Sequence, residues 1–369
     1  MTALQPVRGT RDILPDEMRV HRRVVETARE LGERYGYLEM ATPIFEFTDV
    51  FRRPLGETSD IVSKEMYTFT DRGGDEITLR PEATAAVARA FLSAGLTHQV
   101  PCKFFCHGPM FRYDRPQKGR WRQFHQINVE LLGVAAPLGD IEVIALGAHV
   151  LEELGVLGRI RLELNTLGDP ESRKAYRSVL IDYFSAHRES LSEDSRARLM
   201  RNPLRILDSK DECDRRIVAD APVLSEYLNQ ASVDFFATVR EGLDALGIAY
   251  ELNPRLVRGL DYYTHTIFEF TTEDLGAQSA VMGGGRYDGL VELLGGPPTP
   301  GVGWAAGIER LSMLMDAPPP RRPIAVVPIG DAARMRALLV TQQLRRAGFA
   351  VDLGYGGNVK KRMKRANKV

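Results

Sequence analysis

The segment FRYDRPQKGRWRQFHQINVE, residues 111–130, constrains the fold of this chain more than any other. Pro116 and Gly119 mark a loop in its middle, so the spacing predicts an antiparallel hairpin with strands at Lys103–Tyr113 and Arg120–Leu132. Period-two alternation along the second strand gives it a polar face and a core face. The polar face is expected to carry Arg120, Arg122, Phe124, Gln126, Asn128 and Glu130, and the core face Trp121, His125, Ile127, Val129 and Leu131.

The polar face needs partners, because burying a neutral polar group without one costs about 2–7 kcal/mol. Arginines at this hairpin suit phosphate oxygens, and Phe124 can stack on a flat ring. Gln126 with Glu130 suits a second ligand that carries an amine. The alternative is an exposed, salt-bridged hairpin, which does not explain why the polar row continues into an apolar strand. Five cations fall within eleven residues: Arg112, Arg115, Lys118, Arg120 and Arg122.

Composition restricts the class of protein. A chain of 369 residues with 44% hydrophobic content is long enough for two or three domains. Its 49 basic and 49 acidic residues cancel, so any nucleic-acid contact must use local patches. The sequence has no apolar run of about 18 residues and no secretory signal, so neither a membrane span nor export is expected.

The cysteines favour a reduced, cytoplasmic protein, because three is an odd and sparse set. Cys102, Cys106 and His107 lack a fourth ligand, and alternate residues of a strand point apart, so we expect buried thiols here. No metal-ligand cluster is predicted elsewhere.

The first third of the chain alternates helix and strand signals. A helix is expected over Glu17–Tyr35 and a strand over Leu38–Phe47. Pro43 inside this strand belongs at a sheet edge or at an interface. The helix and strand could pack within one chain or form a dimer interface, and the sequence leaves both alternatives open. Strands at Met66–Thr70 and Glu76–Leu79 lead to LRPEAT, where Pro81 is expected to begin a helix with Glu82 and Thr84 in its first turn. Two roles remain open for Glu82. It can cap the helix, or its carboxylate can bind a ligand at the end of the preceding strand.

Three later stretches complete the pattern. Residues 172–246 are predicted to form a helical insertion. In LVRGLDYYTHT, which follows, six residues contain Arg258, Asp261, Tyr262 and Tyr263. This stretch is either part of a functional site or a tyrosine-rich turn. In VMGGGRYDGL we expect a strand, then the glycines, then a helix. PGVGWAAGIERLSML reads as a glycine-rich strand running into a helix that carries Arg310.

Together these motifs resemble those of the histidyl-tRNA synthetases, a class II aminoacyl-tRNA synthetase family, from RGTRDILP to the C-terminus. TPIFE resembles the first, dimer-forming class motif, FRYDRPQKGRWRQFHQ the second, ATP-handling motif, and GVGWAAGIERL the third. LVRGLDYYT and GGGRYDGL resemble the two histidine-specific peptides of the family. Five separated motifs in the right order are far more specific than any one of them.

The resemblance implies an ATP site. Arg112 and Arg310 would hold the α- and γ-phosphates, and Phe124 would stack on the adenine. Asp114 and Arg120 would assist around the adenine and the pyrophosphate. Mg²⁺ is implied as the ATP counterion.

It also implies a histidine site with three parts. The α-amino group would be bound by Glu82, Thr84 and Gln126. The imidazole would be surrounded by Glu130 and Tyr263, with Tyr262 alongside. Arg258 would sit between the histidine carboxylate and the α-phosphate, and with Arg112 and Arg310 would form the catalytic set.

The implied fold is α+β: an antiparallel class II sheet flanked by helices, with a helical insertion and a partial C-terminal α/β domain. The expected divisions are 1–170 and 248–316 for the catalytic core, 171–247 for the insertion, 317–323 for a linker and 324–369 for an incomplete anticodon-binding-like domain. The implied partners are L-histidine, ATP, tRNA(His) and a second copy of the chain in a homodimer, with no membrane.

Two departures and one rival accompany the resemblance. Ala83 stands where the family pattern has glycine, and the C-terminal domain lacks its second half; if the polypeptide ends at Val369, we expect histidine activation to survive and tRNA charging to be impaired. The rival is the synthetase-like regulatory subunit of ATP phosphoribosyltransferase, which is expected to lack the intact LVRGLDYYT peptide and the C-terminal α/β domain.

Overall fold

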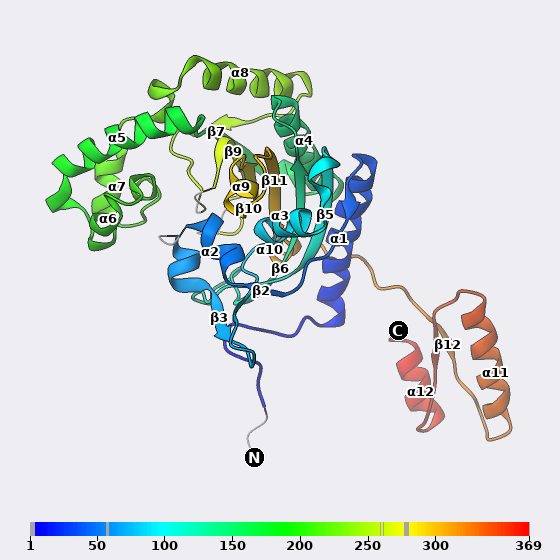
Figure 1. Cartoon of the computed structure of the whole chain (residues 1–369). Coiled ribbons are helices and arrows are strands. Elements are labelled where there is room, and N and C mark those ends of the chain that lie inside the picture. Colours follow the sequence, from blue (N-terminus) through cyan, green and yellow to red (C-terminus); the bar gives the residue numbers. More distant parts are fainter. Residues whose placement is uncertain (1–3, 57–58, 259, 261, 277–279, 369) are drawn as a thin grey trace. The chain divides into compact units, whose positions relative to one another are not determined.

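A computed structural model describes residues 4–56, 59–258, 260, 262–276 and 280–368 (Figure 1). The chain forms two compact units, Met1–Asp316 and Ala317–Val369, which are described separately. Gly259 and Asp261 of the LVRGLDYYT stretch lie outside the described residues.

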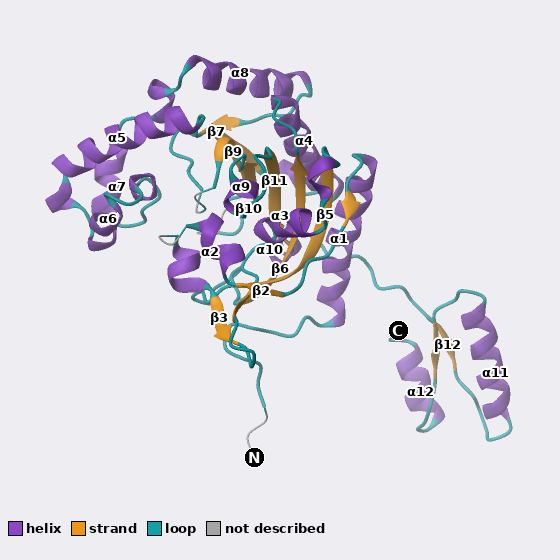
Figure 2. Ribbon diagram, viewed as in Figure 1, coloured by secondary structure: helices purple, strands orange, loops and turns teal. Residues whose placement is uncertain are grey.

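An eight-stranded sheet organises the first unit, in the order β1-β5-β6-β11-β10-β9-β7-β8 (Figure 2). The inner pairs are antiparallel, and the short edge strands β1 and β8 pair parallel to their neighbours. The predicted hairpin and the α+β class are confirmed. The strands are β1 Leu38–Glu39, β5 Cys102–Phe111, β6 Gln123–Leu132, β7 Arg161–Thr166, β8 Glu251–Leu252, β9 Thr264–Thr271, β10 Ala280–Arg286 and β11 Gly301–Gly307.

One face of this sheet is a packed core. Ile127, Val129 and Leu131 of β6 are buried there, as the alternation predicted, and they join the apolar stripe of the first helix. The other face of β6 carries the polar row, so the core helices leave that face free for the site. The helices that contribute to the core cluster are α1 Pro15–Arg34, α4 Pro137–Glu153, α8 Gln230–Ala245 and α10 Ile308–Leu314.

The predicted strand over Leu38–Phe47 is wrong in one respect, because the structure divides it between two sheets. Its first part is β1, and its last part is β2 (Phe45–Phe47) in a separate sheet of order β2-β4-β3, with β3 at Tyr67–Thr70 and β4 at Glu76–Leu79. Pro43 lies between the two parts and has no N–H to donate to a ladder, so the strand breaks there.

The region 170–245 is helical, as predicted, with α5 Pro170–Ala186, α6 Glu193–Arg198 and α7 Glu212–Ala219 preceding α8. Its polar centre is Asp214, whose carboxylate accepts hydrogen bonds from the hydroxyls of Ser192 and Ser195. Short helical turns connect the elements of the first unit: η1 Ile61–Glu65, η2 Leu96–His98, η3 Leu157–Arg159, η4 Arg188–Ser190, η5 Pro203–Ile206 and η6 Leu224–Tyr227.

The second unit alternates strand and helix: β12 Ile324–Val326, α11 Ala333–Arg346, β13 Val351–Leu353 and α12 Val359–Ala366. β12 and β13 pair in parallel, as is usual where a helix connects two neighbouring strands. In the described part of both units, no helix combines the length and the apolar character needed to cross a bilayer.

Candidate active site

A cavity of about 270 Å³ opens on the polar face of the central strands. It gathers segments that are far apart in the sequence: the polar row of β6, the end of β4, the loop before β9, the floor of β10 and β11, and the start of α10. Glu130 does not line the cavity itself, but it hydrogen-bonds to two residues that do, Thr84 and Tyr287. The other predicted site residues all line the cavity: Glu82, Thr84, Arg112, Asp114, Arg120, Phe124, Gln126, Arg258, Tyr262, Tyr263 and Arg310.

Three arginines converge at one end of the cavity. Arg112 Nε donates to the Pro81 carbonyl over 2.9 Å, and Arg310 Nη1 donates to the Ala280 carbonyl over 2.7 Å. Arg120 is held by the Asp114 carboxylate, with Nε 2.6 Å from Oδ2. Burial, and then the nearby charges of Arg120 and Arg112, lower the pKa of Arg310. Such mutual repulsion is relieved by a polyanion, so this end suits a triphosphate.

Phe124 lies beside this cluster, with the Arg112 guanidinium 5.3 Å from its ring centre. The predictions that Arg122 shares the polar face and that Trp121 lies on the core face are wrong, because both residues precede β6, which begins only at Gln123, and Trp121 lines the cavity. The Arg122 guanidinium lies 3.8 Å over the Tyr113 ring instead, and its Nε donates to the Asp114 carbonyl over 3.2 Å. Arg122 therefore stabilises the loop between the two strands and does not line the cavity.

The Glu130 carboxylate is almost fully buried, with 1% of the residue exposed. Thr84 Oγ1 donates to its Oε1 over 2.7 Å, and the Tyr287 hydroxyl donates to its Oε2. Burial raises the pKa of Glu130 to about 8, against the two hydrogen bonds, which lower it. Each carboxyl oxygen has two lone pairs, so Glu130 can still accept a hydrogen bond from a ring nitrogen.

Arg258 reaches the cavity from the loop before β9. Its Nη1 pairs with the Glu269 carboxylate of β9, and the guanidinium lies 5.5 Å from the Tyr263 ring centre. Although burial opposes its charge, Glu269 and then Tyr263 raise the pKa of Arg258. The guanidinium is therefore a fixed cation.

Another part of the cavity wall is built on the start of α3 (Thr84–Ser93). The predicted helix start at Pro81 is early by three residues, because the Glu82 carboxylate accepts from the backbone N–H of Thr84 and of Ala85 at 2.6 and 2.9 Å and so caps the helix. Ala83 has φ −101°, an ordinary value for a residue with a side chain, so alanine fits where the family has glycine.

Two amides of the polar row have unmet hydrogen-bonding capacity. Gln126 Oε1 faces no partner among the described residues, and neither polar atom of the fully buried Asn128 side chain has one there. Gln126 lines the cavity, so its unpaired oxygen is an acceptor for a ligand amine.

The floor of the cavity consists of glycines. The expected order of strand, glycines and helix is wrong, because all three glycines of VMGGGRYDGL lie inside β10, and the helix α9 (Leu290–Leu293) follows. A Cβ at Gly283 would lie 2.6 Å from Arg258 Nη1, one at Gly285 2.5 Å from the Thr266 carbonyl, and one at Gly303 2.1 Å from Glu130 Oε2. A side chain at Gly285 or Gly303 would collide with a backbone carbonyl, of Thr266 at 2.5 Å or of Val129 at 2.4 Å, and one at Gly283 would displace the Arg258 guanidinium.

Sequence reasoning missed two residues of the site, Tyr287 and Glu269. Tyr287 follows the glycines and had no assigned role, while its neighbour Arg286 points away from the cavity into a buried ion pair with Asp140. Glu269 is the polar residue of the apolar run TIFEF, and that alternation was the available signal.

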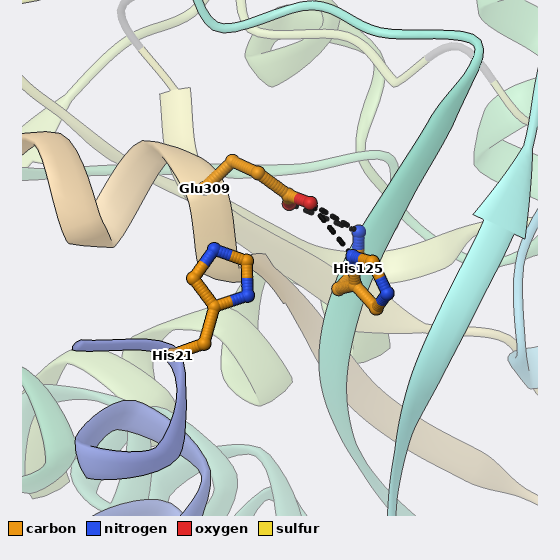
Figure 3. A group of neighbouring side chains, drawn as sticks. All are labelled: His21, His125 and Glu309. Carbon is orange, nitrogen blue, oxygen red and sulfur yellow. Dashed lines mark hydrogen bonds and ion pairs between the residues drawn. The ribbon is translucent and has the colours of Figure 1, made fainter. Parts of the chain in front are cut away.

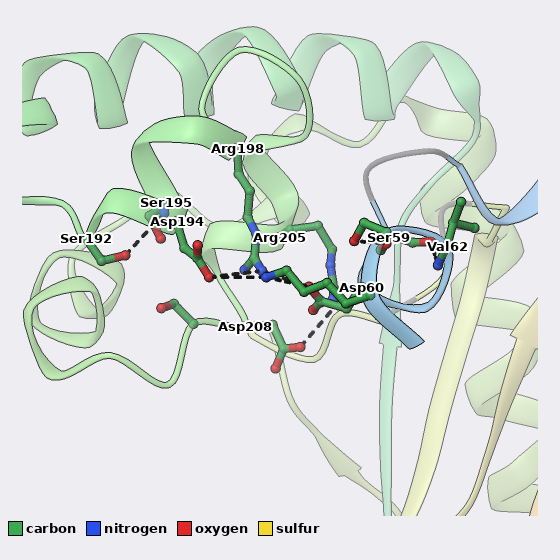
Figure 4. A network of polar contacts seen from close by, with 12 residues as sticks. Ser59, Asp60, Val62, Ser192, Asp194, Ser195, Arg198, Arg205 and Asp208 are labelled. Atoms are coloured by element: carbon green, nitrogen blue, oxygen red, sulfur yellow. Dashed lines mark hydrogen bonds and ion pairs between the residues drawn. The ribbon is translucent and has the colours of Figure 1, made fainter. Parts of the chain in front are cut away.

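A network of ion pairs ties the helical region to the segment that follows β2 and α2 (Asp49–Leu55) (Figure 4). Asp60 is 3.1 Å from Nη2 of both Arg198 and Arg205. The backbone N–H of Tyr113 donates to the Glu65 carbonyl at the other end of η1 over 2.7 Å. Residues 60–65 thus join the helical region to the loop that carries Asp114 and Arg120.

Comparison with known proteins gives one family. Residues 9–311 match the family described as Histidyl-tRNA synthetase. The chain is 64% identical to a histidine–tRNA ligase of Rhodospirillum rubrum, over 100% of this chain and 89% of that protein. The apo histidyl-tRNA synthetase of S. aureus superimposes with a TM-score of 0.83 at 36% identity, covering 99% of this chain and 89% of that one.

A solved structure related to the alternative hypothesis, the regulatory subunit of ATP phosphoribosyltransferase, is also similar to this chain. A protein described as an ATP phosphoribosyltransferase regulatory subunit/histidyl-tRNA synthetase from Bacillus halodurans C superimposes with a TM-score of 0.70 over 96% of this chain and 93% of its own. At 22% identity this likeness shows the fold alone.

Proposed function

The chain belongs to the histidyl-tRNA synthetase family, and we propose that its cavity binds ATP and L-histidine side by side and joins them as histidyl-adenylate. Its activity is that of a histidine–tRNA ligase, which then transfers histidine to the 3′ end of tRNA(His). The observation that supports this assignment is that three arginines converge in the cavity, while two other lining residues, Thr84 and Tyr287, hydrogen-bond to the buried Glu130 carboxylate.

In the proposed arrangement Arg112 and Arg310 hold the α- and γ-phosphates, Asp114 and Arg120 assist, and Phe124 stacks on the adenine. Support comes from the arginine cluster, which lies beside Phe124 and in which Arg112 and Arg310 each donate to a backbone carbonyl, of Pro81 and of Ala280. These hydrogen bonds fix the position of each guanidinium in the cavity. Mg²⁺ enters as the counterion of ATP.

The chemical step needs no nucleophilic side chain. An oxygen of the histidine carboxylate attacks the α-phosphorus, the bond from that phosphorus to the pyrophosphate breaks, and pyrophosphate leaves with the electron pair. The carboxylate is already ionised, so no general base is required. Two anions must approach each other, and Arg258 is proposed to lie between them and to stabilise the charge that develops.

Specificity for histidine is proposed to come from the other end of the cavity. Glu82, Thr84 and Gln126 bind the α-amino group, which the unpaired Gln126 Oε1 supports. Glu130, Tyr262 and Tyr263 surround the imidazole. An imidazole can donate a further hydrogen bond to Glu130 in addition to those from Thr84 and Tyr287, whereas an apolar ring cannot, so histidine binds more tightly.

The test of the proposed function is exchange of pyrophosphate into ATP without tRNA. We expect exchange with histidine and none with phenylalanine or glutamine at equal concentration. A folded chain that binds histidine but catalyses no exchange would favour the regulatory-subunit reading instead.

Replacing Tyr287 by phenylalanine is expected to raise the KM for histidine about tenfold with a smaller change in kcat. The Tyr287 hydroxyl donates to Glu130, so its loss frees the carboxylate to turn away from the imidazole. The matched control is Tyr183→Phe, which removes a hydroxyl that donates to the Ile217 carbonyl in the helical region over 2.8 Å. Equal effects of the two substitutions on the exchange kinetics would refute the role of Tyr287.

We propose that the chain forms a homodimer through the small sheet. Ile44, Phe45, Phe47 and Phe69 are exposed on β2, β3 and the residue before β2, at 44, 56, 61 and 48%. A cluster of exposed aromatic side chains on one sheet marks a protein–protein contact.

Sedimentation is expected to show a dimer. Phe47→Asp is expected to raise the dissociation constant of the dimer at least tenfold, and Phe349→Asp, at an exposed phenylalanine of the second unit, is the control. An active wild-type monomer would contradict the proposal.

The cytoplasm is the proposed location. All three cysteines are free thiols, two of them buried, and free thiols persist in reducing compartments.

A further inference from the structure

A His–His–Glu cluster to which the proposed reaction assigns no role adjoins the cavity: His21 of α1, His125 of β6 and Glu309 of α10 (Figure 3). Each residue offers one ligand atom, and these atoms lie within 4.8 Å of one another. No local sequence pattern indicates the cluster, because its members are separated by more than a hundred residues and are brought together only by the fold. Glu309 itself lines the cavity, together with Trp121, Phe124 and Arg310.

His21 is the member whose environment is incomplete. The residue is 3% exposed, and its Nε2 has no hydrogen-bond partner among the described residues. The nearest carboxylate oxygen to Nε2, from Glu17, is 4.0 Å away. Figure 3 shows the His21 ring directed toward the space between Glu309 and His125. A buried ring nitrogen without a partner, beside a carboxylate and a second imidazole, is typical of a metal ligand.

The other two members are already held in a geometry that suits ligation. The Glu309 carboxylate accepts from the His125 backbone N–H at 2.9 and 3.0 Å, and His125 Nδ1 lies 2.8 Å from Oε1. The backbone N–H can stay on one carboxylate oxygen while the other oxygen binds an ion, an arrangement that orients ligating carboxylates in general. The His125 side chain is 23% exposed, which leaves a route for an ion to enter.

We propose that His21, His125 and Glu309 form a binding site for a divalent transition metal ion of the Zn²⁺ type, distinct from the Mg²⁺ that accompanies ATP. Two imidazoles and one carboxylate suit Zn²⁺ or Co²⁺, whereas Mg²⁺ prefers oxygen ligands alone. A tetrahedral ion with bonds of about 2.0–2.1 Å holds its ligands roughly 3.4 Å apart, so the side chains must close on the ion by rotation. Three protein ligands leave the fourth position to water.

A bound ion would tie together α1, β6 and α10 next to the ATP end of the cavity. Glu309 directly precedes Arg310, and His125 lies between Phe124 and Gln126 in β6. The ion therefore has a structural role, in which it fixes the start of α10 relative to β6.

The test uses the full chain with Cys213→Ser in every sample, since that exposed thiol also binds metals. The chelator-treated protein is titrated with Co²⁺ followed by its visible absorption, and with Zn²⁺ followed by calorimetry and by the melting temperature. We expect one equivalent to bind with the absorption of a tetrahedral Co²⁺ site and to raise the melting temperature. His21→Gln and Glu309→Gln are expected to weaken binding at least tenfold.

The control is His187→Gln, which removes an exposed histidine of the helical region and is expected to bind as the parent does. If His21→Gln does not fold, Glu309→Gln carries the test, because its amide oxygen still accepts the His125 N–H. Equal affinity in the parent and in the folded variants, or no binding by the parent, overturns the proposal.

Discussion

Arg258→Ala is expected to lower histidine-dependent pyrophosphate exchange by about 100- to 1,000-fold, mainly through kcat. The guanidinium is held by Glu269 and Tyr263 before any substrate arrives, so it stabilises developing charge without having to move. Steady-state exchange kinetics over a range of histidine and ATP concentrations would separate kcat from the two KM values. Arg258→Lys keeps the charge but loses the planar fork, and we expect it to recover only part of the activity.

The matched control is Arg255→Ala, three residues earlier in the same loop. The Arg255 guanidinium donates to the carbonyls of Ala219 and Ala221 at 3.0 and 2.7 Å, so its loss acts on the anchoring of the helical region. We expect a lower melting temperature with nearly normal exchange. Comparable loss of kcat in both variants would mean that Arg258 acts through the fold and not on the reaction.

Glu130→Gln is expected to cost histidine activation about 10- to 100-fold and, above about pH 8, to make the folded protein more stable than the wild type. Burial raises the pKa of Glu130 to about 8, whereas the unfolded chain ionises it near an ordinary value of about 4.3. Between these values the folded state binds more protons than the unfolded state, so the wild type loses stability as the pH rises through this window. Glutamine does not ionise, so the variant keeps the free energy of unfolding that the wild type loses, which is about a few kcal/mol.

Urea unfolding of both proteins at about pH 5, pH 7 and pH 9 would measure the difference in unfolding free energy. That difference is expected to grow with pH and to level off above about pH 8. Glu226→Gln, at an exposed carboxyl of the helical region, is the control and is expected to leave the pH profile unchanged. A difference for Glu130→Gln that does not change with pH would show that this carboxyl is ionised in the folded protein at every pH tested.

The parts of the site that lie on regular elements could be predicted from the sequence. Alternation along β6 placed Phe124, Gln126 and Glu130 on one face, and β5 and β6 fix that alternation by their pairing. The same reasoning failed for Arg122, because it precedes the first residue of β6, and alternation holds only inside a strand.

Other features could not be predicted, since they depend on the register between strands distant in the sequence. The contact of Tyr287 with Glu130 exists because β11 lies between β6 and β10, and Gly303 leaves room for the carboxylate. The ion pair of Arg258 with Glu269 likewise depends on how the loop before β9 folds back over that strand. Local patterns identified each residue as polar and gave no information on its partner.

The glycine floor sets where this enzyme can change in evolution. A Cβ at Gly283, Gly285 or Gly303 would lie no more than 2.6 Å from an existing heavy atom, and those atoms include a strand carbonyl and the Glu130 carboxylate. Every missense codon change at these positions adds that carbon. We therefore expect selection against substitutions at Gly285 and Gly303 in particular, where the added carbon would meet backbone carbonyls at 2.5 and 2.4 Å. A descendant of this gene would acquire a new substrate more readily by exchanging side chains that line the cavity than by changing these two glycines.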